Sequence, residues 1–228
     1  MINLLTIDLE DYYQVSAFEG IVKREHWGKY ESRIERNTYR LLEILDQAEA
    51  LSNITVHDHS STPNPELRTS NSLSSPHSPI TTCGTKATFF CLGWNAERFP
   101  GLIKEIYRRG HEIACHGYDH QLLYTMTPKQ FQEDIRKSKR ILEDIIGKEV
   151  VGYRAPSYSI TRRSLWAFEI LAQEGFWYDS SVFPIHHDRY GIPNAPRFPF
   201  LVDLNGGNDP KFIPSPLHLT PNALHLTL

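Results

Sequence analysis

The chain has 228 residues, of which 40% are hydrophobic and 22% are charged, and its formal net charge is −3. These values are ordinary for a globular protein and exclude a fibrous or wholly disordered chain. Lysine and arginine are mixed with aspartate and glutamate rather than gathered in blocks, so the sequence lacks the electrostatic footprint of a nucleic-acid-binding protein. The length fits one large α/β domain better than two small ones.

The chain begins with a short apolar segment that does not resemble a targeting signal. It lacks a basic start and meets acid at Asp8, so we expect no signal peptide. No apolar run approaches the roughly 20 residues that a membrane span needs. We therefore expect a cytoplasmic protein without a membrane anchor.

Short apolar runs alternate with stretches of helical period, which is typical of parallel strands joined by crossover helices. The expected strands are 4–9, 87–92, 112–116, 150–153 and 177–183. The expected helices are 31–49, 96–109, 128–146 and 162–174. The helix at 128–146 is the best marked, because Thr127 and Gln130 form a capping pair, Pro128 occupies the first helical position and Gly147 follows the end. The predicted fold class is α/β.

Two segments show neither period. Residues 51–84 are dense in serine, threonine, proline and asparagine, so we predict a disordered surface insertion whose three histidines are solvated. Residues 206–228 contain four prolines and are predicted to be irregular. The expected organisation is one catalytic domain over 1–215, with an irregular tail over 216–228.

Several residues that could bind a metal are better explained as structural. Cys83, Cys91 and Cys115 have no CxxC spacing, and the last two lie in apolar runs typical of the core. His111 alternates with His116 along the predicted strand and should face the other way. We expect none of the cysteines, and not His111, to bind the metal.

His116 and His120 follow the predicted strand at 112–116. On one helical turn, positions four residues apart share a face, so both imidazoles could reach one cation. Alone this HxxxH pair is a weak pattern, equally typical of surface or capping histidines. Its place after a strand favours a metal site, because α/β barrels build their sites at the carboxyl ends of strands.

The first strand ends with three carboxylates in four positions, at Asp8, Glu10 and Asp11. Such crowding disfavours the ionised forms unless a cation lies among them or solvent surrounds them. Strand alternation places Asp8 and Glu10 on one face, whereas Asp11 can point inward only if the strand has ended. Together with two histidines, a carboxylate here predicts a catalytic metal site with an open position.

Two further strand ends carry polar residues. Arg154 follows the strand at 150–153 and either pairs with a carboxylate, keeping it ionised, or lies at the surface. Asp179 ends the next strand and either orients a histidine or caps the following turn.

Taken together, these segments resemble the polysaccharide deacetylase family, also called carbohydrate esterase family four, and especially its branch linked to exopolysaccharide synthesis. The resemblance covers about 1–50 and 85–215. The segments that match the family's first acidic motif, its HxxxH metal motif, its Arg-x-Pro motif and its fourth motif are 6–11, 116–120, 154–156 and 179–181.

The resemblance implies a distorted (β/α) barrel and a divalent metal, zinc above all, held by one aspartate and two histidines. The implied reaction is the hydrolysis of N-acetyl groups from a polysaccharide or amino-sugar oligomer. A carboxylate base would deprotonate the attacking water, Arg154 would keep that base ionised, and a late histidine oriented by Asp179 would protonate the amine.

The register of the first motif leaves two assignments open. Aligning the acidic pair makes Glu10 the base and Asp11 the ligand, whereas a shifted register gives Asp8 and Glu10. We favour Asp11 as the metal ligand beside His116 and His120, with Asp8 and Glu10 as competing bases.

The sequence departs from the family at its end, because His218 and His225 lie in a proline-rich tail that does not resemble the expected late strand. We therefore expect a barrel that is incomplete at the C-terminus. Two other functions stay open: an amidohydrolase acting on a cyclic imide or ureide, and a metal- or glycan-binding module with impaired catalysis.

Overall fold

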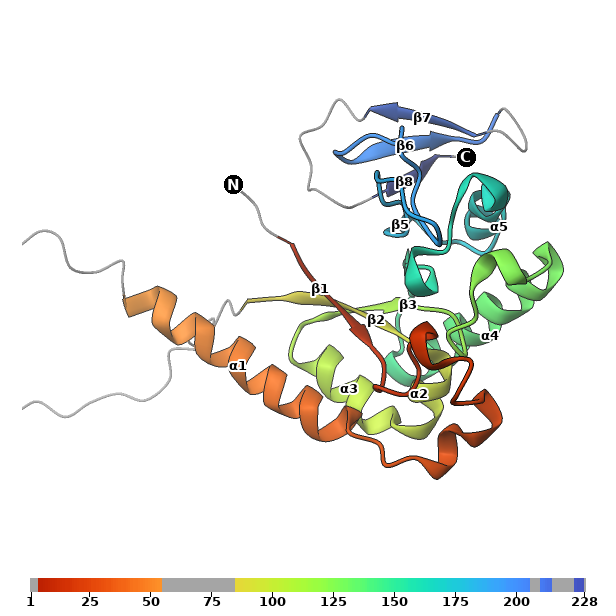
Figure 1. The fold of residues 1–228 in the computed structure, drawn as a ribbon. Helices are drawn as coiled ribbons and strands as arrows, with labels where there is room; N and C mark the ends of the chain where they lie inside the picture. Colours follow the sequence, from red (N-terminus) through yellow and green to blue (C-terminus); the bar gives the residue numbers. More distant parts are fainter. Residues whose placement is uncertain (1–3, 55–84, 206–209, 215–223, 228) are drawn as a thin grey trace, which may run out of the picture.

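The computed structural model describes residues 4–54, 85–205, 210–214 and 224–227. Its eight strands form one sheet in the order β1-β2-β3-β4-β5-β8-β6-β7 (Figure 1). The strands are Leu5–Leu9 (β1), Ala87–Cys91 (β2), Glu112–Cys115 (β3), Gly152–Tyr153 (β4), Tyr178–Asp179 (β5), Phe200–Asp203 (β6), Lys211–Pro214 (β7) and Leu224–Thr227 (β8).

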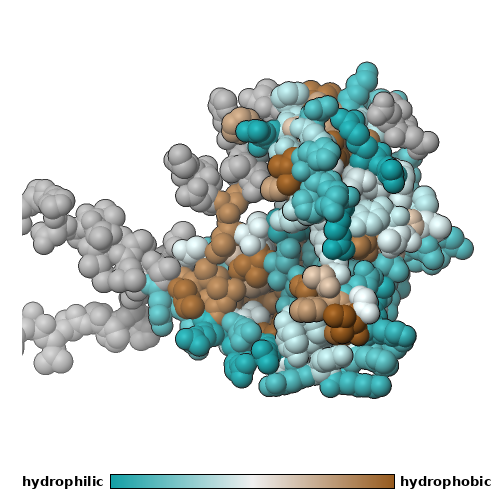
Figure 2. All heavy atoms as spheres, in the orientation of Figure 1, coloured by the Kyte–Doolittle hydropathy of each residue, from teal (hydrophilic) through white to brown (hydrophobic). Residues whose placement is uncertain are grey.

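The first five strands are parallel, each paired with the next one in the chain. Beyond β5, β8 pairs antiparallel to it and parallel to β6, and β7 pairs antiparallel to β6. The predicted α/β class is confirmed. The described strands form an open sheet rather than a closed barrel, and hydrophobic residues are exposed over the start of the edge strand β1, where Leu4 and Leu5 lie (Figure 2).

The helices are Ile34–Ile54 (α1), Gly93–Arg98 (α2), Pro100–Arg108 (α3), Pro128–Ile146 (α4) and Ala167–Gln173 (α5). Helix α4 has the predicted bounds: Thr127 and Gln130 form the reciprocal capping box, and Gly147 ends the helix with φ 67°. None of the described helices is long and apolar enough to cross a membrane.

Other helix predictions were wrong in their bounds. The helix expected at 96–109 is two helices, because Pro100 has no N–H to continue α2 and starts α3 instead. The helix expected at 162–174 begins as a 3₁₀ turn, Arg162–Ser164, before α5. Helix α1 runs to Ile54 and so enters the segment predicted to be an irregular insertion.

The prediction of an irregular C-terminal part was wrong for β7 and β8. Pro214 is compatible with β7 because this strand pairs with β6 alone, at the edge of the sheet, where a missing N–H need not break a ladder. Residues 55–84, with Cys83 and the insertion's histidines, and residues 215–223, with His218, lie outside the described residues.

The structure places Cys91, Cys115 and His111 in the packed interior. Cys91 and Cys115 are buried beneath the sheet, and burial raises the pKa of both thiols. His111 precedes β3 at the amino end of the sheet, where its Nδ1 accepts a 3.2 Å hydrogen bond from the Ala87 N–H. These side chains therefore belong to the packing of the domain.

Candidate active site

Glu10, His116 and His120 converge at the carboxyl end of the parallel strands. Glu10 follows β1 and His116 follows β3, and because the strands are parallel these ends share one edge of the sheet. The three side chains offer ligand atoms that all lie within 4.8 Å of one another. A group of two imidazoles and one carboxylate therefore exists at the predicted edge.

The two histidines meet through a loop and not on the predicted helical turn. Residues 116–120 are non-helical, and both Gly117 and His120 have positive φ, at 76° and 57°. The two imidazole centroids lie 5.5 Å apart. A positive φ is uncommon for a residue other than glycine, and such conformations cluster at functional sites.

The hydrogen bonds of this group leave polar atoms free. His116 Nδ1 lies 2.8 Å from the carbonyl oxygen of Arg154, so Nδ1 donates and Nε2 keeps its lone pair. Burial lowers the pKa of His116, which keeps the ring neutral. Within the described residues, His116 Nε2 and Glu10 Oε2 are buried without a hydrogen-bond partner, although Glu10 Oε2 lies 2.9 Å from His120 Nε2.

Buried polar atoms without partners are costly and call for an explanation. A cation among Glu10, His116 and His120 would remove that cost, because each of the three can offer a lone pair to it. Two nitrogen donors and one oxygen donor suit catalytic zinc with an open fourth position. The donor set therefore fits a divalent metal.

Asp11 was predicted to lie with the two histidines, but the structure places its carboxylate elsewhere. The Asp11 carboxylate accepts hydrogen bonds from Ser32 Oγ at 2.6 Å and from the Arg33 N–H at 3.1 Å, so it caps the amino end of α1. Strand β1 ends at Leu9, and the turn that follows points Glu10 toward the histidines instead. Glu10, and not Asp11, therefore lies beside the two histidines.

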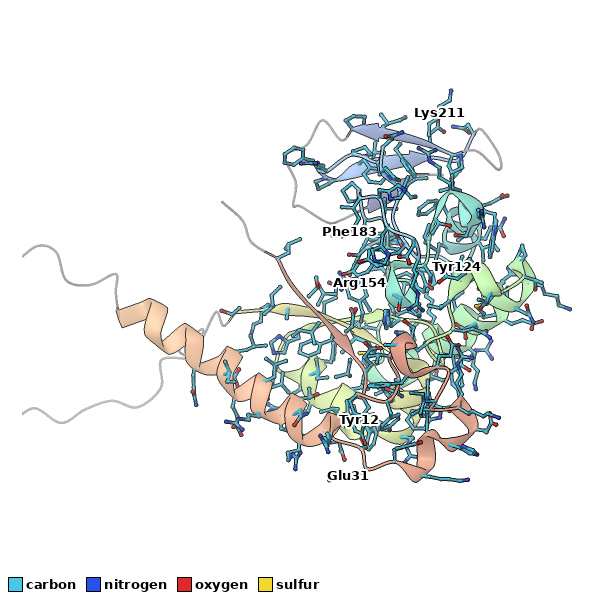
Figure 3. All side chains as sticks on the ribbon, in the orientation of Figure 1. Tyr12, Glu31, Tyr124, Arg154, Phe183 and Lys211 are labelled. Carbon is cyan, nitrogen blue, oxygen red and sulfur yellow. The ribbon has the colours of Figure 1, made fainter. Side chains whose placement is uncertain are left out.

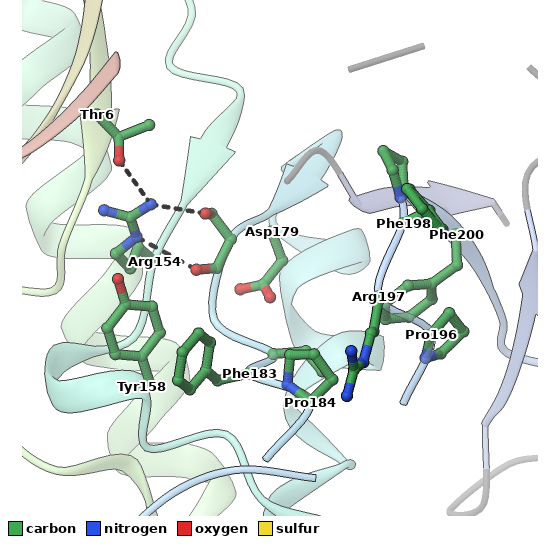
Figure 4. Close-up of a pocket in the computed structure, with 13 residues that line it drawn as sticks. Thr6, Arg154, Tyr158, Asp179, Phe183, Pro184, Pro196, Arg197, Phe198 and Phe200 are labelled. Carbon is green, nitrogen blue, oxygen red and sulfur yellow. Dashed lines mark hydrogen bonds between the residues drawn. The ribbon is translucent and has the colours of Figure 1, made fainter. Parts of the chain in front are cut away.

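Arg154 holds Asp8 beside the group. Its Nη1 donates to Asp8 Oδ1 at 2.8 Å, and Nη2 donates to Thr6 Oγ1 at 3.1 Å and Ser180 Oγ at 2.7 Å, the last two shown in Figure 4. Arg154 is 5% exposed, so the surface alternative is wrong and the predicted carboxylate pair is confirmed. The second Asp8 oxygen, Oδ2, lies 3.9 Å from His116 Nε2.

Asp179 fastens a turn and, among the side chains that the structure describes, contacts no histidine. Its two oxygens accept hydrogen bonds from Ser181 Oγ at 2.5 Å and from the Ser181 N–H at 2.8 Å, and Ser181 Oγ accepts from the Ala155 N–H at 2.7 Å. Burial raises the pKa of Asp179 to about 7. Among the side chains that the structure describes, the turn-capping alternative is therefore the one observed.

Helix α4 supports the histidine loop through residues that the sequence reasoning missed. Asp134 Oδ2 accepts a 3.0 Å hydrogen bond from the Tyr118 N–H, and Ser138 Oγ donates a 2.8 Å hydrogen bond to the Gly117 carbonyl. Burial raises the pKa of Asp134 to about 7. The signal for Ser138 was its polar side chain on the otherwise apolar face of the helix.

A cavity of about 260 Å³ adjoins the Arg154 guanidinium (Figure 4). Tyr158, Phe183 and Phe200 line it with aromatic rings, and Arg197 adds a second cation. Figure 3 shows Arg154 in the interior between the parallel strands and the segment that carries Phe183. The cavity can therefore receive a ligand next to the Asp8–Arg154 pair.

Comparison with known proteins shows that part of this chain is similar to a described family. Residues 80–174 match the family described as polysaccharide deacetylase, a range that includes His116, His120 and Arg154. This part of the chain is similar to polysaccharide deacetylases. Glu10 and Asp8 lie before the matched range, so their place in the site comes from the structure.

Three relatives of this chain carry similar descriptions. It is 36% identical over 102 residues to the peptidoglycan deacetylase of Helicobacter pylori, covering 45% of this chain and 33% of that one. It is 38% identical over 132 residues to the peptidoglycan deacetylase-like protein FGM2 of Gibberella zeae, covering 58% and 38%. It is 39% identical over 85 residues to a peptidoglycan-N-acetylglucosamine deacetylase of Bacillus cereus, covering 37% and 31%. The chain thus spans about a third of the length of these relatives.

Proposed function

We propose that this protein is a metal-dependent hydrolase that removes N-acetyl groups from a polysaccharide or an amino-sugar oligomer. The observation that carries the proposal is the buried group of Glu10, His116 and His120 with the Asp8–Arg154 pair beside it. The family match over residues 80–174 supports the reaction class, and the relatives described as peptidoglycan deacetylases support an N-acetylated glycan rather than a cyclic imide. A role in exopolysaccharide biosynthesis is proposed from the sequence resemblance alone.

In this proposal Glu10, His116 and His120 hold a divalent cation, with zinc the ion that best suits the donor set. When bound, the metal polarises the acyl carbonyl and lowers the pKa of water. The hydrogen bond from His116 Nδ1 to the Arg154 carbonyl fixes the ring so that Nε2 faces the group.

Asp8 is the proposed general base. Arg154 holds its carboxylate through Oδ1, which leaves Oδ2 on the side of the histidines to accept a proton from the attacking water. The hydroxide oxygen then bonds to the acyl carbon, the carbon–nitrogen bond breaks, and the proton on Asp8 can pass to the departing amine. Glu10 then serves as a metal ligand. Asp8 and Glu10 are the two residues that the shifted register of the first motif gives.

Acetate release from a chito-oligosaccharide tests this function. The wild-type chain with added zinc, cobalt or nickel should release acetate, and His116→Ala and Asp8→Asn should abolish the release. His186→Ala is the matched control, because His186 is exposed and lies outside the group, and it should keep full activity. Absence of acetate from folded, metal-loaded wild-type protein would argue against the proposal.

A second candidate is a glycan-binding protein with slow turnover. It is favoured by one observation: within the described side chains, Asp179 bonds to Ser181 and not to a histidine that could serve as the acid. Calorimetry separates the two candidates, since binding of the oligosaccharide without acetate release supports the second.

A further inference from the structure

A second cavity, of about 530 Å³, lies outside the candidate active site. It opens where the 3₁₀ turn Arg162–Ser164 and the start of α5 face the loop around residue 190. The side chains that give it its character are Tyr124, Arg162, Arg163, Trp166, Arg189 and Tyr190. No residue of the candidate active site lines this cavity.

The cavity is strongly cationic although the whole chain carries a formal charge of −3. Arg162, Arg163 and Arg189 line it, and within the described residues none of their guanidinium groups forms an ion pair. The one carboxylate in the lining is Asp188, which lies 2.8 Å from His187 Nδ1. Guanidinium groups match carboxylates in a bidentate geometry, so their convergence in one cavity favours an anionic ligand.

The cavity walls also offer aromatic faces. Tyr124, Trp166 and Tyr190 line it, and His187 stacks on Tyr190 with a centroid distance of 4.0 Å. Binding sites for organic ligands combine such apolar surfaces with a few polar groups that fix orientation. A sugar has this mixed character, because its ring presents C–H groups on its faces and hydroxyl groups at its edge.

One layer of rings connects the second cavity to the first. The Tyr190 ring lies 6.2 Å from Tyr158 and 6.1 Å from Phe183, measured between centroids. Tyr158 and Phe183 line the cavity beside Arg154. Rings that line one cavity therefore lie beside a ring that lines the other.

We propose that the second cavity binds a carboxylate-bearing sugar unit of the glycan whose neighbouring unit enters the first cavity. The link to deacetylation rests on the proposed function, whereas the binding of the acidic unit does not. The chain would thereby prefer acidic glycans over neutral ones of equal length.

Isothermal titration of the full chain with two matched ligands tests the proposal. The ligands are peptide-free peptidoglycan strands with their lactyl carboxylates intact and the same strands with these carboxylates reduced to alcohols. Wild-type protein should bind the intact strands about tenfold more tightly, as expected for charge-assisted hydrogen bonds. The triple variant Arg162→Gln, Arg163→Gln, Arg189→Gln should lose this preference and keep its affinity for the reduced strands.

The matched control is the triple variant Arg36→Gln, Arg40→Gln, Arg140→Gln, which makes the same change in net charge at exposed positions on α1 and α4. It should keep the preference. Equal wild-type affinity for both strands, or the same loss in both triple variants, would overturn the proposal. An intact preference without acetate release from either ligand would instead overturn the proposed deacetylation and leave the acidic-sugar site standing.

Discussion

Arg154 and Asp8 are 146 positions apart in the sequence, yet Nη1 of the arginine lies 2.8 Å from Oδ1 of the aspartate. The parallel order of the strands brings them together, since β1 and β4 end at the same edge of the sheet. Arg154 is further fixed by Ser180 and packs over the Phe90 ring, 4.1 Å from its centroid. The pair is therefore a rigid part of the site.

Arg154→Gln should lower the turnover of acetylated oligosaccharide about 100-fold, because Asp8 would lose the guanidinium that orients its carboxylate. Asp8→Asn should lower it at least as much, and the double variant should be no worse than the poorer single one, since the two residues act as a unit. Acetate release at saturating metal measures all three. Arg136→Gln, which removes a partner of Glu174 far from the site, is the control and should keep wild-type turnover.

The choice between Glu10 and Asp11 as ligand can be settled with two isosteric variants. Glu10→Gln should lower zinc affinity at least about 100-fold, because it removes an anionic donor from the group. Asp11→Asn should leave zinc affinity near the wild-type value and cost about 1 kcal/mol of stability, since it weakens the cap of α1. Zinc titration and urea unfolding give both quantities. The reverse pattern would restore the sequence-based assignment of Asp11.

Only part of the fold and of the candidate site could be predicted from the sequence. The bounds of α4 were predictable because its capping box, proline and glycine are all local, and the edge where the site forms followed from the order of the parallel strands. Which carboxylate lies beside the histidines was not predictable, because Asp11 bonds to Ser32 and to the Arg33 N–H, which lie on another segment. Strand β8 was missed for a similar reason, because its partner β5 is distant in sequence. Strand β7 pairs with the nearby β6 and was missed because the prolines of this segment predicted irregular structure.

Asp134 on α4 holds the loop between His116 and His120 through its hydrogen bond from the Tyr118 N–H. This contact gives a third prediction. Asp134→Ala should cost about 1–3 kcal/mol of stability, because the half-buried Tyr118 N–H would lose its acceptor, and should weaken zinc binding about tenfold by loosening the loop. Asp144→Ala, an exposed change on the same helix, is the control and should alter neither quantity. Unchanged zinc affinity in a destabilised Asp134→Ala protein would show that this contact serves folding alone.

Asp179 predicts a pH dependence of stability. Burial raises its pKa from the ordinary value of 3.8 to about 7, so between these pH values the folded chain holds a proton that the unfolded chain has released. Stability contributed by the protonated carboxyl is therefore fully present below about pH 4 and is lost as the pH rises to about 7. The loss is on the order of a few kcal/mol.

Asp179→Asn removes this titration, so the stability of the wild type relative to the variant should fall between pH 4 and 7 and stay level above. Urea unfolding of both proteins at several pH values, with a chelator present to exclude metal binding, measures the difference. Other titrating groups, including Asp134, contribute equally to both proteins and cancel. A constant difference across this range would mean that the Ser181 hydrogen bonds hold Asp179 ionised in the folded chain, against the effect of burial.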